Sequence, residues 1–423
     1  MRHLLRPALA FAVVLLLAGC GGTEPEGDGG ASQAAAPSPG AEATSEGGGE
    51  AQGEPIRIGT LTELSGPFAP WGVAVRNGMQ MAVADINDNG GVNGQPLELV
   101  ERDTQSVPEE GVTALRGMIE RDGIIAAGGV ISSDVGLATA RIAEQEQIPL
   151  FLVKAGSGAI LTPDSRYTFR TCLPAAPMTM GPVVNYLEQE GLSRAGAIFA
   201  DYEWGQSVRE AFESQVGSMQ GVETQIEVAP VDETDFTSYL RSIQQLQPDV
   251  IVATGHPPGT GAIVSQSAEL GIDAVVTGPW VTLASVMEGV GDAAFDRFID
   301  FDCADYSSTE YQELAARYNE QFDAFMEDDA VAAYGIVTML AESIEATGET
   351  DPAAIAEHLH ASTFDLPGYP SELSWTEWGE LANSTPVVSI IREQEPPEGV
   401  NPGANWYPEV LLTSDPLEPY QPE

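Results

Sequence analysis

The side chains that most often carry out catalysis are scarce in this chain of 423 residues. The sequence contains four histidines: His3, His256, His358 and His360. His358 and His360 are two positions apart in a segment with helical periodicity, so they cannot share one face of a helix. The metalloprotease pattern HExxH, the esterase pattern GxSxG and the phosphate-binding P-loop do not occur. Because no nucleophile stands beside a base, we expect a protein that is not an enzyme and uses no cofactor.

The cysteines and acidic residues form no metal-binding pattern. The three cysteines, Cys20, Cys172 and Cys303, have no CxxC spacing, so the sequence predicts no zinc site. The segment 85–90 begins like a calcium-binding loop, but its twelfth position is Pro96 rather than glutamate. We therefore expect no metal centre.

Acidic residues far outnumber basic ones. The chain has 64 aspartates and glutamates against 17 lysines and arginines, for a formal net charge of −47 at pH 7. Nucleic acid is not an expected partner, because phosphate contacts require basic patches. The single lysine is Lys154. A solvated acidic surface explains this balance, and halophilic adaptation is a further hypothesis, because salt screens the self-repulsion of such a surface.

The N-terminal region has the pattern of a secretory signal. Two arginines precede an apolar run over residues 8–18, which is too short to span a bilayer. The run ends in Leu-Ala-Gly-Cys at residues 17–20, which resembles a bacterial lipobox. That resemblance implies that residues 1–20 form a lipoprotein signal peptide and that acylated Cys20 anchors the protein to the membrane. The alternative is an ordinary signal peptide that contains a cysteine.

A low-complexity segment follows the signal. Residues 21–54 are rich in Gly, Ala, Ser, Pro and Glu and lack the large apolar side chains that folding requires. We predict a disordered acidic tether between the membrane and a folded region. The predicted location is extracytoplasmic, lipid-anchored to the cell membrane on its periplasmic or outer face. In such an oxidising compartment Cys172 and Cys303 form an even pair.

From Pro55 on, segments with strand and helix patterns alternate. Two successive units of this kind, before and after Pro174, predict an α/β fold in two lobes, each a mostly parallel sheet covered by helices. The tail from Pro396 on is rich in proline and acids and is predicted to wrap a surface. Ligands of parallel sheets bind beyond the carboxyl ends of the strands. The loops expected at those ends are rich in serine, glycine and aromatic residues: 63–71, 128–134, 154–159, 201–205, 255–259 and 278–282.

A series of short motifs identifies the family that this chain resembles. They are Ser65-Gly66-Pro67, Ala84-Asp85-Ile86-Asn87, Gly90-Gly91-Val92-Asn93-Gly94, Phe169-Arg170-Thr171 and Asp201-Tyr202-Glu203-Trp204-Gly205. Each motif alone is weak, but their order over about residues 55–380 is specific. The chain resembles the branched-chain amino-acid (leucine/isoleucine/valine) binding proteins, which are periplasmic binding proteins of type I.

That resemblance implies an architecture and a role. Two Rossmann-like lobes with parallel sheets are joined by a three-strand hinge and close on a small ligand. Lobe 1 would comprise residues 55–171 and 304–365, and lobe 2 would comprise residues 172–303 and 366–423 with the C-terminal tail. The protein would be a monomer that serves the permease and ATPase subunits of an ABC importer. The alternative is a sensor that reports its ligand to a signalling partner, but the lipid anchor favours transport.

The resemblance also implies which residues bind the ligand. The implied set is Trp71, Ser132, Ser133, Ala155, Ser157, Tyr202, Trp204, His256 and Trp280. Ser132 and Ser133 stand where the family holds a ligand carboxylate, although a helix N-cap would also place serines there. The backbone of Ala155 and the hydroxyl of Ser157 would add hydrogen bonds. Trp71 would cover the ligand, and the remaining aromatic residues would form the wall of the second lobe.

One position departs from the family's pattern. Members that bind amino acids carry an acid that pairs with the ligand ammonium, and this chain has Trp280 there, which offers only a cation–π contact. The predicted ligand is therefore of the amino-acid, aromatic-acid or amide type. The alternative is that Trp280 packs within its lobe and that Glu203 or Asp201 reaches the ammonium.

The resemblance also implies positions for Lys154 and for the two cysteines Cys172 and Cys303. Lys154, beside Ala155, would either pair with a ligand carboxylate or be a surface or hinge lysine that points away. Cys172 and Cys303 fall at the first and second crossovers, which are adjacent in this fold. We expect these two cysteines to lie close together, either bonded in a disulfide or as two free thiols.

Overall fold

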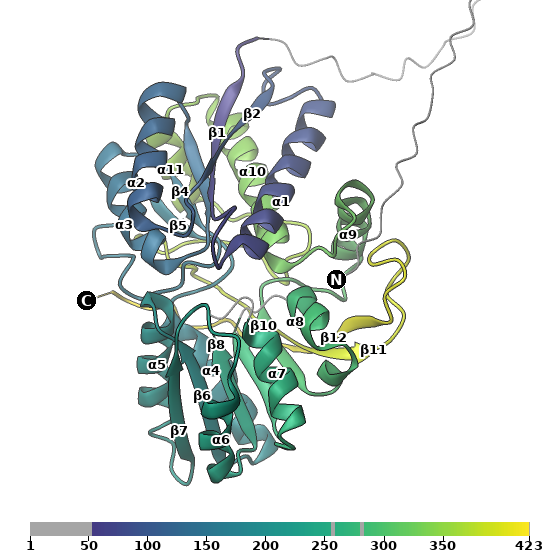
Figure 1. The fold of residues 1–423 in the computed structure, drawn as a ribbon. Helices are drawn as coiled ribbons and strands as arrows, with labels where there is room; N and C mark the ends of the chain where they lie inside the picture. Colours follow the sequence, from purple (N-terminus) through teal and green to yellow (C-terminus); the bar gives the residue numbers. More distant parts are fainter. Residues whose placement is uncertain (1–52, 255–258, 280–282, 423) are drawn as a thin grey trace, which may run out of the picture. The chain divides into compact units, whose positions relative to one another are not determined.

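The computed structural model describes residues 53–254, 259–279 and 283–422, whose strands form two sheets (Figure 1). The first sheet has the strand order β2-β1-β3-β4-β5, and all its pairs are parallel. Its strands are β1 (Ile56–Thr62), β2 (Leu97–Asp103), β3 (Ala126–Val130), β4 (Leu150–Leu152) and β5 (Thr168–Arg170). Strands β3, β4 and β5 are buried at every position, because helices cover both faces of a parallel sheet.

Helices α1, α10 and α11 pack together, and α2 packs on α3. The bounds of these helices are α1 (Ala69–Asp88), α2 (Pro108–Gly117), α3 (Ser133–Glu146), α10 (Asp328–Thr347) and α11 (Pro352–Ala361). A single turn of π-helix, Met118–Asp122, continues α2. The contact of α1 with α10 requires a glycine, since a Cβ at Gly78 would lie 2.3 Å from the carbonyl oxygen of Ala330.

The second sheet has the strand order β12-β11-β10-β9-β8-β6-β7 among the described residues. Its strands are β6 (Arg194–Ala200), β7 (Glu223–Ala229), β8 (Val250–Thr254), β9 (Val275–Pro279), β10 (Phe298–Asp302), β11 (Val387–Glu393) and β12 (Trp406–Thr413). The pairs from β7 to β10 are parallel, whereas β11 and β12 join the sheet as an antiparallel extension. Its helices are α4 (Ala176–Glu190), α5 (Glu203–Gln215), α6 (Thr237–Ile243), α7 (Gly259–Glu269) and α8 (Leu283–Val290).

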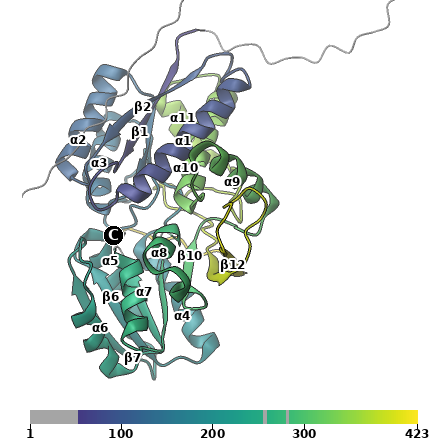
Figure 2. The same cartoon turned by 45° about the vertical axis from the view of Figure 1, so that its right-hand side comes forward.

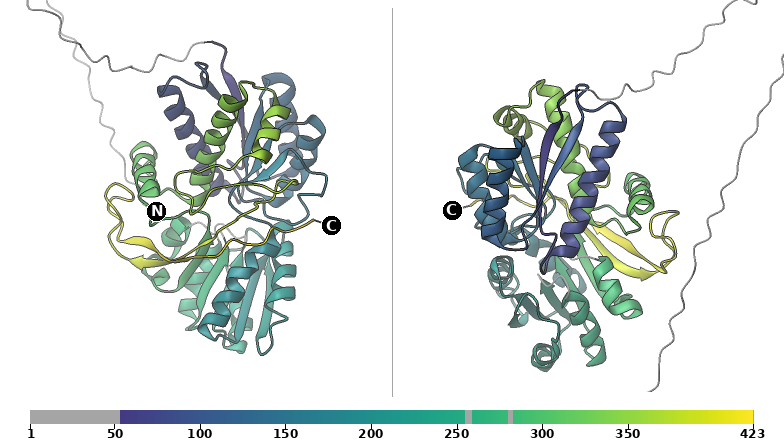
Figure 3. Two further views of the ribbon diagram at one scale, coloured as in Figure 1. Left: turned by 180° about the vertical axis from the view of Figure 1, so that it is seen from behind. Right: turned by 45° about the horizontal axis from the view of Figure 1, so that its top comes forward.

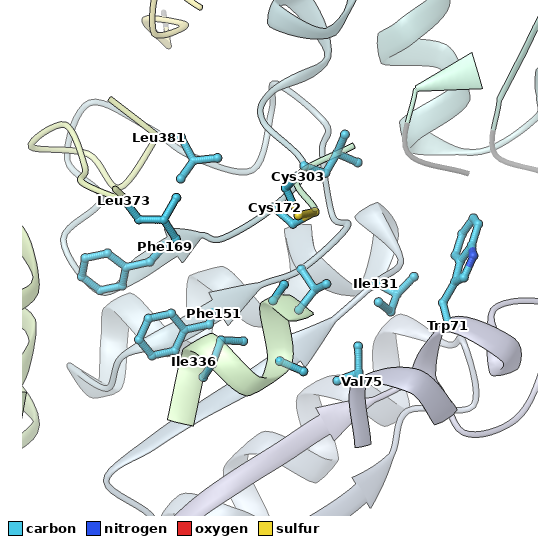
Figure 4. Packing of buried hydrophobic residues seen from close by; sticks show 14 of the residues in the cluster. Trp71, Val75, Ile131, Phe151, Phe169, Cys172, Cys303, Ile336, Leu373 and Leu381 are labelled. Atoms are coloured by element: carbon cyan, nitrogen blue, oxygen red, sulfur yellow. A yellow bond between two sulfur atoms is a disulfide. The ribbon is translucent and has the colours of Figure 1, made fainter. Parts of the chain in front are cut away.

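The chain passes between the two sheets three times. It leaves β5 for α4, leaves β10 for helix α9 (Thr309–Phe322) and then α10, and leaves α11 for β11. Cys172, after β5, and Cys303, after β10, are joined by a disulfide with a Cα–Cα distance of 5.3 Å. Figure 4 shows this disulfide among buried apolar side chains of the largest hydrophobic cluster. The first two crossovers are thus covalently linked.

The predicted α/β fold of two lobes, each built on a mostly parallel sheet, is confirmed. The prediction for the C-terminal tail was incomplete, because residues 406–413 form the edge strand β12. Beyond β12 the chain does run over a surface, where the backbone of Leu417 bonds Ser384 and the indole of Trp378 bonds the carbonyl of Tyr420 (Figure 3). Within the described residues, the helices are all too short or too polar to cross a bilayer.

Candidate functional site

The six loops expected to hold a ligand follow the carboxyl ends of β1, β3, β4, β6, β8 and β9. Residues of four of them, those after β1, β3, β4 and β6, meet at one place between the two sheets. The loop segments 255–258 and 280–282, with His256 and Trp280, lie outside the described residues, as does Cys20. Trp71, Ser132, Ser133, Ala155, Ser157, Tyr202 and Trp204 all lie within the described part of the chain.

The start of helix α3 forms the first wall of this site. Ser132 stands at the N-cap position, yet its side chain makes no capping hydrogen bond. Instead, the buried carboxylate of Glu63, directly after β1, accepts hydrogen bonds from the backbone N–H groups of Ile131 (3.1 Å) and Ser132 (3.0 Å). Burial raises the pKa of Glu63 to about 7, although these hydrogen bonds oppose the shift. The sequence analysis did not identify Glu63, whose only signal is an acid within an apolar segment.

Gly72 fixes the position of Glu63 against helix α1. A Cβ at Gly72 would lie 2.0 Å from the carbonyl oxygen of Glu63, so only glycine lets the first turn of α1 pack there. The neighbouring residue in α1 is Trp71, which the same contact brings to the site. The glycine directly after Trp71 therefore has a steric basis in this structure.

A buried arginine holds the loop after β4, residues 154–159, which is called the ligand loop below. The guanidinium of Arg170 donates to the carbonyl oxygens of Ala155 and Ser157, the latter at 2.7 Å. Arg170 also forms an ion pair of 3.0 Å with Glu380, and both side chains are buried. The third crossover carries Glu380, so this ion pair ties the ligand loop to the hinge region. Arg170 is a positioning residue that the sequence motif contained without revealing its role.

Ser133 and Ser157 are brought together, and Ser157 also reaches the second sheet. The backbone N–H of Ser157 donates to the hydroxyl oxygen of Ser133 (3.2 Å). The hydroxyl of Ser157 donates to the carboxylate of Glu203, in the first turn of α5, at 2.7 Å. Burial, and then the charge of Glu203, raise the pKa of the nearby Asp134. Two acids from different lobes therefore flank the serine pair.

Aromatic rings close the site on the side of helix α1. The ring of Phe68 stacks on that of Trp71 at a centroid distance of 5.8 Å and contacts Tyr202 at 5.3 Å. Among the described residues, the buried Nε1 of Trp71 has no hydrogen-bond partner. Burial, followed by the charges of Asp134 and Glu63, raises the pKa of Tyr202 well above its usual range. Tyr202 is therefore a neutral phenol.

Trp204 packs against the ligand loop. Its indole N–H donates to the hydroxyl of Thr254 at 2.8 Å, and its ring packs against Gly156, where a Cβ would approach it to 2.4 Å. Gly156 therefore has to be glycine for the loop to rest on the ring. In this arrangement the indole N–H of Trp204 is already used within the protein.

Lys154 is buried, which rules out a surface position. Its Nζ lies 3.0 Å from the carboxylate of Asp328 and 3.4 Å from that of Asp329, and 5.3 Å from the ring centroid of Trp71. The neighbouring carboxylates raise the pKa of Lys154 despite the opposing effect of burial, so the ammonium stays charged. Lys154 therefore belongs to an ion network near the hinge.

Cys172, Cys303 and Asp328 form a group of potential metal ligands in the described part of the chain. Because the two sulfur atoms are bonded to each other, they are not thiolate ligands in this state.

The site between the two sheets offers hydrogen bonding by hydroxyl and indole donors, with stacking on aromatic rings. Such a site suits the capture of a small polar molecule.

Comparisons with known proteins agree with this geometry. Residues 55–394 match the family model described as periplasmic binding protein. The leucine-, isoleucine-, valine-, threonine-, and alanine-binding protein of Pseudomonas aeruginosa is 27% identical over 345 residues, which cover 78% of this chain and 87% of that protein. Such relatives are solute-binding proteins rather than enzymes.

Two solved structures are similar in fold. An ABC transporter substrate-binding protein from Sphaerobacter thermophilus is 25% identical with a TM-score of 0.73, and the match covers 86% of this chain and 99% of that one. A solute-binding protein of an ABC transporter from R. palustris, solved in complex with benzoate, is 19% identical with a TM-score of 0.74, covering 87% and 99% of the two chains.

Proposed function

Because this chain belongs to the periplasmic binding protein family, we propose that it is the extracytoplasmic solute-binding component of an ABC importer. The observation that carries the proposal is the hydrogen-bonded chain from Ser133 through Ser157 to Glu203, which joins the ligand loops of the first sheet to a helix of the second. A site built from both halves of a hinged protein captures a ligand by closing on it.

The proposed ligand is a small molecule of the amino-acid, aromatic-acid or amide type. The names of the relatives support this range, because one is named for binding leucine, isoleucine, valine, threonine and alanine, and another was solved with benzoate. The start of α3, with Ser132, and the hydroxyl of Ser133 suit a carboxylate or amide oxygen. The hydroxyl proton of Ser157 bonds Glu203, so its oxygen suits an N–H donor of the ligand. The buried Nε1 of Trp71 is a further donor for such an oxygen. Ala155, Tyr202, Trp204, His256 and Trp280 complete the proposed ligand-binding set.

Two lobes and a membrane anchor complete the proposal. Residues 55–171 and 304–365 would move as one lobe, and residues 172–303 and 366–423 as the other.

The protein would act as a monomer, tethered by residues 21–54 and acylated Cys20 near its permease and ATPase partners. Replacement of Cys20 by serine should release the protein from the membrane fraction, and a variant that stays membrane-bound would contradict the lipid anchor.

A thermal-shift screen tests the proposed function. The panel contains L-leucine, L-isoleucine, L-phenylalanine, benzoate, 4-hydroxybenzoate and benzamide. A ligand at 100 times its dissociation constant stabilises the folded state by about 2.7 kcal/mol, which appears as a clear rise in melting temperature. A rise with at least one class of compound is expected. No rise with any of them would contradict the proposed ligand type.

Ser157→Ala supplies a variant that separates specific binding from general stabilisation. It removes the hydroxyl that bonds Glu203, whereas the exposed Ser218→Ala leaves the site intact. The shift should shrink in Ser157→Ala and persist in Ser218→Ala. An equal shift in both variants would place the binding site elsewhere.

A further inference from the structure

Glu327 makes a buried contact between the two halves of the protein. Its carboxylate accepts hydrogen bonds from the backbone N–H groups of Leu283 (3.2 Å) and Ala284 (2.7 Å), the first two residues of α8. Helix α8 follows β9 of the second sheet, whereas Glu327 immediately precedes α10, which packs on α1 beside the first sheet. Figure 2 shows α8 on the side of the second sheet that faces α1 and α10. Glu327 is only 3% exposed.

The residues after Glu327 connect this contact to the ligand loop. Asp328 and Asp329 both pair with Lys154, whose Nζ lies near the ring of Trp71. Lys154 is the first residue of the ligand loop, and it directly precedes Ala155, whose carbonyl oxygen Arg170 holds. Three consecutive acids therefore link the loop after β4 to the start of α8.

Two hydrogen bonds make Glu327 a direct link between α8 and the start of α10. Burial removes the carboxyl oxygens of Glu327 from water, so they depend on the two N–H donors that α8 supplies. Burial also raises the pKa of Glu327. Beside it lies an open groove of about 570 Å³, lined by Val73, Asn77, Met287, Tyr318 and Trp406 among others. Leu283 and Met287 of α8 also belong to one buried apolar cluster with Met326, so the hydrogen bonds of Glu327 act together with apolar packing.

We infer that Glu327 is a positioning residue for ligand capture, which seats α8 against the ion network of Lys154 when the two lobes close. The inference rests on the proposed function, since it assigns Glu327 a part in that same binding event. Glu327 would not touch the ligand. It would raise ligand affinity by stabilising the closed arrangement that the ligand loop and α8 form together.

Amide hydrogen exchange tests the seating of α8 without any ligand. In Glu327→Ala, the amides of Leu283 and Ala284 should exchange about tenfold faster, because each loses its buried acceptor and opens locally. Glu327→Gln retains an amide oxygen and should restore most of the protection. Glu288→Gln, on the exposed face of α8 itself, is the matched control and should match the wild type. Unchanged exchange in Glu327→Ala would overturn the inference.

Titration calorimetry with L-isoleucine and benzoate tests the link to binding. The dissociation constant of whichever probe binds the wild type should rise about fivefold in Glu327→Ala, a typical coupling effect, and stay unchanged in Glu288→Gln. Faster exchange with an unchanged dissociation constant would overturn the role in capture. If neither probe binds the wild type, the proposed ligand type fails, and the exchange experiment still decides whether Glu327 seats α8.

Discussion

The hydroxyl of Ser157 lies 2.7 Å from the carboxylate of Glu203, and this hydrogen bond joins the loop after β4 to the first turn of α5. The contact crosses from the first sheet to the second at the site where Ser133 also bonds Ser157. A charged acceptor makes this one of the stronger hydrogen bonds between the two halves. Loss of this hydrogen bond should therefore lower ligand affinity more than it lowers the stability of the fold.

Glu203→Ala should weaken ligand binding. Removing a hydrogen bond to a charged group costs about 1.5–3 kcal/mol when buried, and partial exposure reduces this, so we expect a dissociation constant raised by about fivefold to tenfold. The measurement is calorimetry with the best ligand of the thermal-shift panel. Glu213→Ala, near the C-terminal end of the same helix and exposed, is the control and should bind normally. Equal affinity in the two variants would show that the contact with Ser157 does not support capture.

Glu63 should give the folded state a specific dependence on pH. Burial raises its pKa from 4.5 to about 7, so the native state binds a proton that the unfolded chain releases between these values. This stabilising contribution is fully present below pH 4.5 and is lost as the pH rises through 7, by about 3 kcal/mol in total. Denaturant unfolding of the wild type and Glu63→Gln from pH 5 to pH 8 checks it. The wild type should lose stability relative to the variant as the pH rises, and parallel curves would contradict the prediction.

Breaking the buried pair of Arg170 and Glu380 should strongly destabilise the protein. Arg170→Met leaves an unpaired buried carboxylate, which costs about 3–5 kcal/mol. The exposed pair of Arg57 and Glu98 provides the comparison, and Arg57→Met should cost less than about 1 kcal/mol. The free energy of unfolding in urea measures both. A cost for Arg170→Met no larger than that for Arg57→Met would mean that the buried pair does not hold the ligand loop.

Salt should stabilise the folded chain. With a formal net charge of −47, self-repulsion opposes the compact state, and molar salt shortens the screening length to about 3 Å. The melting temperature should rise from low salt to molar NaCl. A melting temperature that does not change with salt would contradict the hypothesis of halophilic adaptation.

Much of the fold could be predicted because each element leaves a local signal. The alternation of apolar strands with helical periodicity from Pro55 on corresponds to the alternating strands and helices from β1 through α3. Strand β12 gave a weaker signal, since Pro408 interrupts it and proline removes an N–H donor. Proline is tolerated there because β12 is the edge strand of its sheet.

The site was harder to predict, because its supports are distant in sequence. Glu63 bonds residues 131 and 132, and Arg170 bonds the ligand loop and Glu380, 210 positions away. Neither spacing has a local pattern, so only the folded chain reveals these contacts. Lys154 is similar. Its neighbours in sequence suggested either a ligand contact or a surface or hinge position, and its partners Asp328 and Asp329 lie at the start of α10.

The central claim is that one small molecule binds between the two lobes, and titration calorimetry of the full chain tests it most directly. The compound with the largest thermal shift is titrated into the wild type and into Ser133→Ala, with Ser218→Ala as the control. We predict saturable binding of one molecule per chain in the wild type and control, with weaker binding in Ser133→Ala. Absence of saturable binding by every compound of the panel, or equal affinity in Ser133→Ala, would contradict the account.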